Sequence, residues 1–394
     1  MIHYIRYFLI LTAMIFPCVQ GESDGLAPEV TDLNASDISW NQERNLPYLE
    51  NAYISGSPQD ISDGIQVGKL GADGGDEKLV RDFAHSIAQA PQDTKHSTDS
   101  LLIWYKGKLL FESYYRRGRI NVPHYQMSIT KSYTALALGR AMQLGYISMA
   151  DLNRPVLSFL KDVDGEKLAP GSESVLLHEA MHMKSGIRVD NAKAKKAMKT
   201  PENLVGQKQI QTYLELSAPI TEKSKSVFKY QGSDPTITMQ VLSSILPVKV
   251  EDFIRKDFLG KLGITSYGWQ TDVSGFPKAA AGSSFRSRDM LKMGILVYNK
   301  GAFNGEQVIP AEFIERAISP LDVSKYRTYG YFWWGHKAKV KEKDYKCVSG
   351  RGAGGQFIQI FPDLELIIIV TSHNKGMGTM LKDAPLNIIP AFAL

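Results

Sequence analysis

The sequence predicts an α+β fold, in which helices flank one antiparallel sheet and an all-helical segment is inserted into the chain. Segments rich in aromatic and branched residues, which are typical of strands, occur near both ends of the chain, around 101–111 and 329–371. The stretch between them has helical periodicity interrupted by proline-containing loops. With 394 residues and 43% hydrophobic content, the chain has ample material for a core. We therefore expect both ends of the chain to build one sheet.

The charge balance excludes several classes of protein. The chain has 46 Lys and Arg residues against 41 Asp and Glu residues, a net charge of +5, and 22% of its residues are charged. This composition is typical of a globular protein rather than a disordered or fibrous one. No run of Lys or Arg resembles a nucleic-acid footprint, so we expect no nucleic-acid partner. Nothing in the sequence indicates an oligomeric state.

The first residues are typical of a secretory signal peptide. Arg6 precedes an apolar run at 7–19, which is shorter than the about 20 residues that span a membrane. Small residues near the end of the run predict cleavage after Gly21, which would remove residues 1–21. A lipoprotein site at Cys18 is disfavoured because bulky residues precede it. No later segment reaches spanning length, so we expect a periplasmic or secreted protein without a membrane span.

The remaining chain divides into an arm and a domain. Residues 22–75 are rich in Asp, Gly, Ser, Asn and Pro without a sustained period, so we expect an extended N-terminal arm ahead of a domain at 76–394. The first elements expected in that domain are a helix at 77–90, a hairpin at 101–111 with Gly107 in its turn, and a helix at 128–144 ended by Gly145.

The middle of the domain, at about 126–280, is the expected helical insertion. Helical spacing recurs within it at 175–183, 207–216 and 237–246. Strands are expected again at 329–334, 356–361 and 364–371, with Pro362-Asp363 as the turn between the last two.

The first candidate for chemistry is Ser128-Ile129-Thr130-Lys131, at the start of an expected helix. Positions three apart lie on one face of a helix, so the Ser128 hydroxyl and the Lys131 amine can meet. A serine becomes a nucleophile when a nearby base takes its proton, and apolar surroundings lower the pKa of a lysine so that it can act as that base. The helix N-terminus adds positive potential where an oxyanion would form. The four-residue motif also occurs by chance, so it needs support.

Two further segments supply that support. Tyr230 precedes a polar turn that opens an expected helix, and a phenol beside a lysine can relay protons. Segment 350–356 is rich in glycine and leads directly into an expected strand, which lets the backbone approach a ligand and direct an N–H group at a carbonyl. A phosphate loop is disfavoured, because no Lys-Ser/Thr pair follows and the segment enters a strand rather than a helix.

In this order, the Ser-x-x-Lys motif, a tyrosine about 100 residues later and a glycine-rich turn into a C-terminal hairpin resemble the serine β-lactamase and penicillin-binding-protein superfamily. The likeness is strongest to the branch that holds class C β-lactamases, family VIII esterases and 6-aminohexanoate-dimer hydrolase. It covers residues 100–373, and the other stretches that support it are 100–111, 175–187, 281–290 and 329–334.

The resemblance implies a β-lactamase/transpeptidase-like fold and an acyl-enzyme mechanism that needs neither a metal nor an organic cofactor. By that resemblance, Ser128 is the acylated nucleophile, Lys131 its base partner and Tyr230 the general acid and base. The backbone N–H groups of Ser128 and Ala353 would form the oxyanion hole. The implied substrate is a small-molecule amide or ester.

The chain departs from the β-lactamase pattern at two places. Gly350-Arg351-Gly352 stands where β-lactamases usually have Lys-Thr-Gly, and Gly232 stands where an asparagine is customary. The missing groups help to hold penicillins, so the pattern is more like that of the amide and ester hydrolases. Arg351 can replace the cation, since its planar fork suits carboxylates. The residues expected to line the substrate site are Arg351, Gly352, Trp333 and Trp334.

A second motif competes with this interpretation. His178-Glu179-Ala180-Met181-His182 matches H-E-x-x-H, in which two histidines one helical turn apart hold zinc and the glutamate activates water. A third ligand is required, yet Arg188 stands where the longer form of the motif has histidine, and Glu202 follows a lysine-rich loop. We interpret the histidines as structural, with residues that line a pocket as the next alternative and zinc ligands as the third. A zinc metallopeptidase is therefore one alternative function, and a non-catalytic pseudo-hydrolase that binds peptidoglycan or peptides is another.

Two other residues receive structural interpretations. Asp234 is expected to cap the helix that follows it. Cys347 is expected to be a buried or inert thiol. Because it is the one cysteine beyond the predicted signal peptide, we expect no internal disulfide. With these assignments, the sequence predicts an exported serine hydrolase that acts as a carboxylesterase, an amide-oligomer hydrolase or a β-lactamase-like enzyme.

Overall fold

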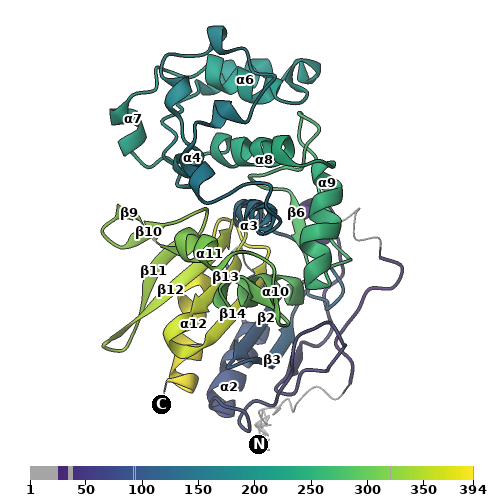
Figure 1. The fold of residues 1–394 in the computed structure, drawn as a ribbon. Helices are drawn as coiled ribbons and strands as arrows, with labels where there is room; N and C mark the ends of the chain where they lie inside the picture. The colour runs from purple at the N-terminus through teal and green to yellow at the C-terminus, as the bar shows by residue number, and fades with distance from the viewer. Residues whose placement is uncertain (1–24, 34–38, 92, 94, 320, 394) are drawn as a thin grey trace, which may run out of the picture.

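The core of the molecule is one nine-stranded antiparallel sheet (Figure 1). The computed structural model describes residues 25–33, 39–91, 93, 95–319 and 321–393. The strand order is β1-β3-β2-β14-β13-β12-β11-β10-β9. The strands are β1 (Tyr53–Ser55), β2 (Thr98–Tyr105), β3 (Lys108–Tyr114), β9 (Leu321–Ser324), β10 (Arg327–Tyr329), β11 (Trp334–Val340), β12 (Lys343–Gly352), β13 (Gln356–Phe361) and β14 (Leu366–Ser372). Because β2 pairs with β14, the two ends of the chain meet at the centre of the sheet.

Local sequence explains the central strands. In the β2–β3 hairpin, Lys106 and Gly107 both have positive φ angles, of 45° and 93°, as a two-residue turn with the right twist requires. The residues of β14 are buried throughout, which explains its continuous apolar sequence. A short 3-10 turn at Pro362–Leu364 connects it to β13. The predicted hairpins at 101–111 and 356–371 are confirmed.

Helices cover both faces of the sheet. On one face lie α2 (Glu77–Gln89) and α12 (Met380–Phe392), which contact each other. On the other lie α3 (Ile129–Gln143), α10 (Ser287–Tyr298) and α11 (Ala311–Ile318). A buried ion pair joins the second layer to the sheet, with the Arg288 guanidinium of α10 2.6 Å from the Glu112 carboxylate of β3. The predicted helices at 77–90 and 128–144 are confirmed.

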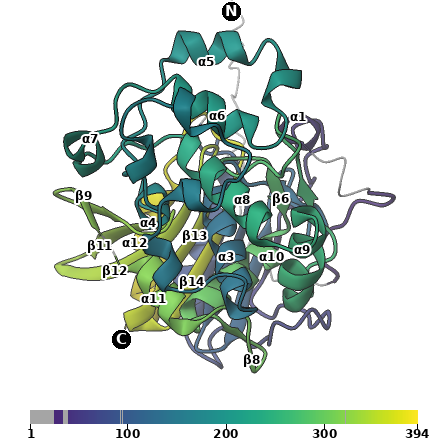
Figure 2. The ribbon, with the colours of Figure 1, turned by 45° about the horizontal axis from the view of Figure 1, so that its top comes forward.

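The helical part of the molecule stands at one end of this sheet (Figures 1 and 2). It lies in sequence between two short paired strands, β4 (His124–Tyr125) and β6 (Ser283–Phe285). Its helices after α3 are α4 (Leu177–Met181), α5 (Asn191–Ala197), α6 (Lys208–Glu215), α7 (Glu222–Ser226), α8 (Ser233–Ile245) and α9 (Val250–Phe253). Both views place α3 between α8 and the sheet, and α3 contacts both α8 and β12. The predicted α+β fold with a helical insertion is confirmed.

The predicted strand at 329–334 is wrong. The Gly330 N–H donates to the Trp333 carbonyl and Phe332 has a φ of 62°, so residues 330–333 form the tight turn that joins β10 to β11.

The expected arm contains α1 (Trp40–Glu43) and the edge strand β1, which pairs with β3. The predicted signal peptide lies outside the described residues, and no helix within them is long and apolar enough to cross a membrane.

Candidate active site

The N-terminal turn of α3 brings Ser128 and Lys131 together. Ser128 is the N-cap residue immediately before α3, and Met127 before it has a positive φ of 49°. The Lys131 amine lies 3.0 Å from the Ser128 hydroxyl oxygen and donates to the Ala280 carbonyl at 2.7 Å. Almost every residue of α3 is buried, because the helix runs between α8 and the sheet. This burial lowers the pKa of Lys131 to about 8.

Tyr230 reaches the same place from the loop before α8. Burial raises the pKa of the Tyr230 phenol, and the neighbouring Ser128 side chain opposes that rise. The Lys131 nitrogen lies 4.8 Å from the centroid of the Tyr230 ring. The structure therefore brings together the hydroxyl, amine and phenol that the sequence singled out.

A network missed by the sequence analysis holds the Tyr230 loop. Asp234 lies in the first turn of α8 and does not cap it; the N-cap is Gly232, which has no side chain. The buried Asp234 carboxylate accepts hydrogen bonds from Ser185 at 2.8 Å and Gln231 at 2.7 Å. Burial raises the pKa of Asp234 to about 6. The expectation of a helix cap is thus wrong, because the Asp234 side chain accepts from Ser185 of another loop and from the Gln231 side chain just before α8.

The glycine-rich turn lies beside the start of α3. A Cβ atom at Gly352 would overlap the backbone oxygen of Gln126, and one at Gly350 would lie 3.2 Å from Ile129. Glycine at these positions lets β12 pass close to the chain around Ser128. Ala353 follows as the first residue of the turn and is exposed. Within the described residues, neither the Ser128 N–H nor the Ala353 N–H donates to another protein group.

Arg351 has partners within the sheet. Its guanidinium donates to the Ser349 hydroxyl at 2.8 Å, contacts His336 Nδ1 at 2.7 Å and lies 5.3 Å from the Trp334 ring centroid. Burial lowers the pKa of Arg351 to about 10 and that of His336 to about 3. The hollow that Arg351 lines includes residues of α12 and does not include Tyr230. The fork is therefore engaged by protein groups.

The two tryptophans have different surroundings. Trp333 is buried in the core between the sheet and α3, where a Cβ at Gly350 would approach it to 3.5 Å. Trp334 is half-buried, and its ring centroid lies 5.7 Å from that of Tyr230. Of the pair, Trp334 borders the Tyr230 side chain.

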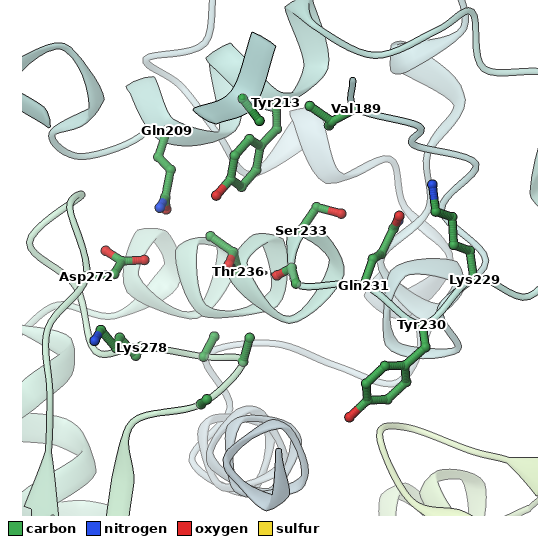
Figure 3. A pocket seen from close by; sticks show the side chains of 15 residues that line it. Val189, Gln209, Tyr213, Lys229, Tyr230, Gln231, Ser233, Thr236, Asp272 and Lys278 are labelled. Atoms are coloured by element: carbon green, nitrogen blue, oxygen red, sulfur yellow. Dashed lines mark hydrogen bonds between the residues drawn. The ribbon is translucent and has the colours of Figure 1, made fainter. Parts of the chain in front are cut away.

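A pocket of about 610 Å³ adjoins this arrangement (Figure 3). Gln209 and Tyr213 of α6 border one side, Ser233 and Thr236 of α8 another, and the Ala279–Ala281 segment that binds the Lys131 amine a third. In Figure 3, Lys229 and Tyr230 point in opposite directions from one loop. The pocket also contains charged groups of both signs, from Lys229, Lys278 and Asp272.

The H-E-x-x-H residues lie on α4 and are bound by their surroundings. His182 Nδ1 is 2.8 Å from the His178 carbonyl, and the His182 ring packs against Tyr331. Glu179 accepts from the Leu176 N–H at 3.0 Å and lies 3.0 Å from the Lys225 amine. Among the described residues, no third potential ligand gathers with these histidines, and Glu202 is not near enough to join them.

Cys347 is buried in the core under α12. Burial raises the pKa of its thiol to about 12, so the reactive thiolate is scarce at neutral pH. This agrees with an inert thiol.

Comparisons with known proteins agree with this architecture. The family model described as Beta-lactamase matches residues 83–391. A class C β-lactamase has a TM-score of 0.61 at 15% identity, covering 80% of this chain and 96% of that chain. A D-stereospecific amidohydrolase from Streptomyces sp. has a TM-score of 0.58 at 14% identity, covering 80% and 98%. The octameric penicillin-binding protein homologue from Pyrococcus abyssi has a TM-score of 0.55 at 19% identity, covering 75% and 73%. At these identities the solved structures show a shared fold. No curated protein matches the sequence at a significant level.

Proposed function

Because the chain belongs to the β-lactamase family and is a serine hydrolase of that family, we propose that it cleaves a small amide or ester through an acyl-enzyme on Ser128. The observation that carries this proposal is the 3.0 Å separation between the Ser128 hydroxyl and the buried Lys131 amine, with the Tyr230 ring centroid 4.8 Å from that amine. Nucleophile, base and proton relay are then within reach of one another.

The proposed reaction begins with proton transfer from Ser128. With a pKa of about 8, roughly a tenth of Lys131 side chains are neutral at pH 7 and can accept that proton. The serine oxygen attacks the substrate carbonyl carbon, and the N–H groups of Ser128 and Ala353 stabilise the oxyanion. Tyr230 protonates the leaving amine or alcohol as the tetrahedral intermediate collapses, and it regains a proton from Lys131, which had taken it from Ser128. Water, deprotonated by the same relay, then attacks the acyl-serine and releases the acid.

The substrate class follows from the groups around the pocket. The Arg351 fork is engaged by Ser349 and His336, and Gly350 and Gly232 provide no side chain at the places where relatives bind penicillins. This favours linear amides and esters over β-lactams. Charged groups of both signs in the adjoining pocket suit a polar or zwitterionic group on one side of the scissile bond. The pattern of residues 1–21 supports export of the enzyme to the periplasm or the medium.

A substrate panel tests the proposal. We expect purified enzyme to hydrolyse short-chain p-nitrophenyl esters with an initial burst and to cleave linear amide oligomers, while turnover of a chromogenic cephalosporin is at least about a hundredfold less efficient. Ser128→Ala is the matched control. A β-lactam turned over faster than any ester or linear amide would overturn the substrate class. Absence of hydrolysis throughout would instead favour a pseudo-hydrolase.

A further inference from the structure

Three residues far apart in the sequence form a buried cluster behind the active site. Glu43 ends the short helix α1, His124 lies in β4 four residues before Ser128, and His373 follows β14. The Glu43 Oε2 atom lies 3.3 Å from His124 Nδ1 and 3.2 Å from His373 Nε2. All three residues are buried, and one ligand atom from each lies within 4.8 Å of the others. The three residues lie too far apart in the sequence for a motif to predict this cluster.

Hydrogen bonds on the outer side of the cluster fix which atoms face inward. His124 Nε2 lies 3.2 Å from the Ser372 carbonyl, which only accepts, so this nitrogen carries the proton and Nδ1 of a neutral ring presents a lone pair. His373 Nδ1 likewise faces the Asp99 carboxylate at 2.6 Å, so Nε2 is directed at the cluster. Neither His373 Nε2 nor Glu43 Oε2 has a hydrogen-bond partner among the described residues. The Glu43 carboxylate therefore lies between two imidazole nitrogens, and a cation can bridge these three ligand atoms.

We propose that Glu43, His124 and His373 bind one zinc ion in a structural site outside the catalytic centre. Ligands at about 2.0–2.1 Å from a tetrahedral zinc ion lie about 3.3 Å apart, which matches the two separations to Glu43. Two imidazoles and one carboxylate suit zinc better than calcium or magnesium, which prefer oxygen ligands. A water molecule would complete the four-coordinate site.

The groups around the three ligands are those expected next to a metal. Asp99 holds His373 in a carboxylate–histidine arrangement, the Ser372 carbonyl orients His124, and the Tyr125 N–H donates to Glu43 Oε1 at 2.5 Å. Such outer contacts fix the tautomer and the orientation of metal ligands. Every ligand of the proposed site is therefore held by a second group of the protein.

The position of the site indicates its effect. The Trp40 ring packs on the His373 ring with centroids 4.6 Å apart. Gly354 lies so close to Trp40 that a Cβ atom at this position would overlap the indole ring. The Asn374 N–H, next to His373, donates to the Gly354 carbonyl at 2.9 Å. Zinc would thus fasten α1 to the turn that carries Ala353 and to the strand that leads to Ser128. It touches no reacting atom, so the inference does not depend on the proposed hydrolysis.

Metal analysis of the protein produced without the predicted signal peptide, residues 1–21, tests the inference. After bound metal is removed with dipicolinate, we expect the protein to take up one Zn²⁺ per chain, as measured by elemental mass spectrometry. The melting temperature of the protein should then rise by several degrees. Glu43→Gln and His373→Asn should each abolish tight uptake and the shift. The double variant His178→Asn/His182→Asn, which removes the other pair of histidines, is the matched control and should still bind one Zn²⁺.

A second measurement keeps the test valid if the cluster variants fail to fold. Co²⁺ added to stripped wild-type protein should give the visible absorption of a four-coordinate ion, and Zn²⁺ should displace it. Labelling of Ser128 by a fluorophosphonate should persist in the stripped protein at low temperature. Lack of Zn²⁺ uptake by the wild type would overturn the inference and identify the cluster as an ion-pair network around a protonated histidine. Loss of uptake in the His178→Asn/His182→Asn control would overturn it as well.

Discussion

The start of α3 and the helix α4 each carry a short motif whose helical spacing brings potential catalytic side chains together, but the two motifs have different surroundings. In α3, the Lys131 amine is bound by the Ser128 hydroxyl and a backbone carbonyl, and among the described residues it forms no ion pair with an acidic group. In α4, Glu179 is engaged by Leu176 and Lys225, and His182 by a carbonyl of its own helix. Helical spacing decides which side chains share a face, but distant residues decide whether their reactive atoms are available. The comparison therefore favours serine chemistry at α3 over metal chemistry at α4.

Removal of the nucleophile should have the largest effect. Ser128→Ala should lower kcat/KM for a p-nitrophenyl ester by about 10⁴-fold or more, because no acyl-enzyme can form. Steady-state kinetics measure this, and circular dichroism shows whether the variant is folded. Substantial activity in a folded Ser128→Ala enzyme would move the chemistry away from α3.

Removal of the amine should be nearly as severe. Lys131→Met keeps the length and burial of the side chain without a base, and we expect kcat/KM to fall by about 10³-fold. In the wild type, the amine must be neutral to accept a proton, so kcat/KM should fall about tenfold per pH unit below a pKa of about 8 and level off above it. Lys131→Arg is the control that stays protonated and should not recover activity. A wild-type rate independent of pH between 6 and 9 would argue against Lys131 as the base.

Loss of the phenol should have a smaller effect. Tyr230→Phe keeps the ring contact with Trp334 but cannot relay protons, so kcat should fall about 10²-fold with little change in KM. The reduction should be larger for an amide than for a p-nitrophenyl ester, whose leaving group needs little protonation. Equal kcat values for Tyr230→Phe and wild type on an amide would remove Tyr230 from the reaction.

Changes in α4 should have the smallest effect. The double variant His178→Asn/His182→Asn should retain ester kcat/KM within about threefold, because these rings serve packing and local hydrogen bonds. The same kinetic assay measures it beside Ser128→Ala. If the α4 variant lost more activity than Ser128→Ala, the zinc metallopeptidase would become the better explanation.

Local signals explain what the sequence predicted well. Helical periodicity and the Lys106-Gly107 turn were sufficient for α3 and the β2–β3 hairpin, since both depend on neighbouring residues. The order of motifs also predicted that Tyr230 would come near Ser128. The aromatic residues at 329–334 predicted a strand, but Gly330 and Phe332 lie in a tight turn. The positive φ of Phe332 is not a conformation that β-propensity describes.

Contacts between distant segments explain what the sequence left out. The position of Asp234 near the start of a helix predicted a helix cap. Its actual partner, Ser185, lies in another loop and is too distant in the sequence to be predicted. The Glu43, His124 and His373 cluster has no spacing pattern at all, since it exists only after α1, β4 and β14 come together around the sheet. Likewise, the contacts of Arg351 with Ser349 and His336 depend on the pairing of β11 with β12.

The most direct measurement of the central claim is the location of a covalent label. Purified enzyme should react with a fluorophosphonate to give one adduct per chain, and peptide mapping by mass spectrometry should place it on Ser128. Labelling should be far slower in Lys131→Met and unchanged in His178→Asn/His182→Asn. An unlabelled wild type, or an adduct on any other residue, would contradict the account.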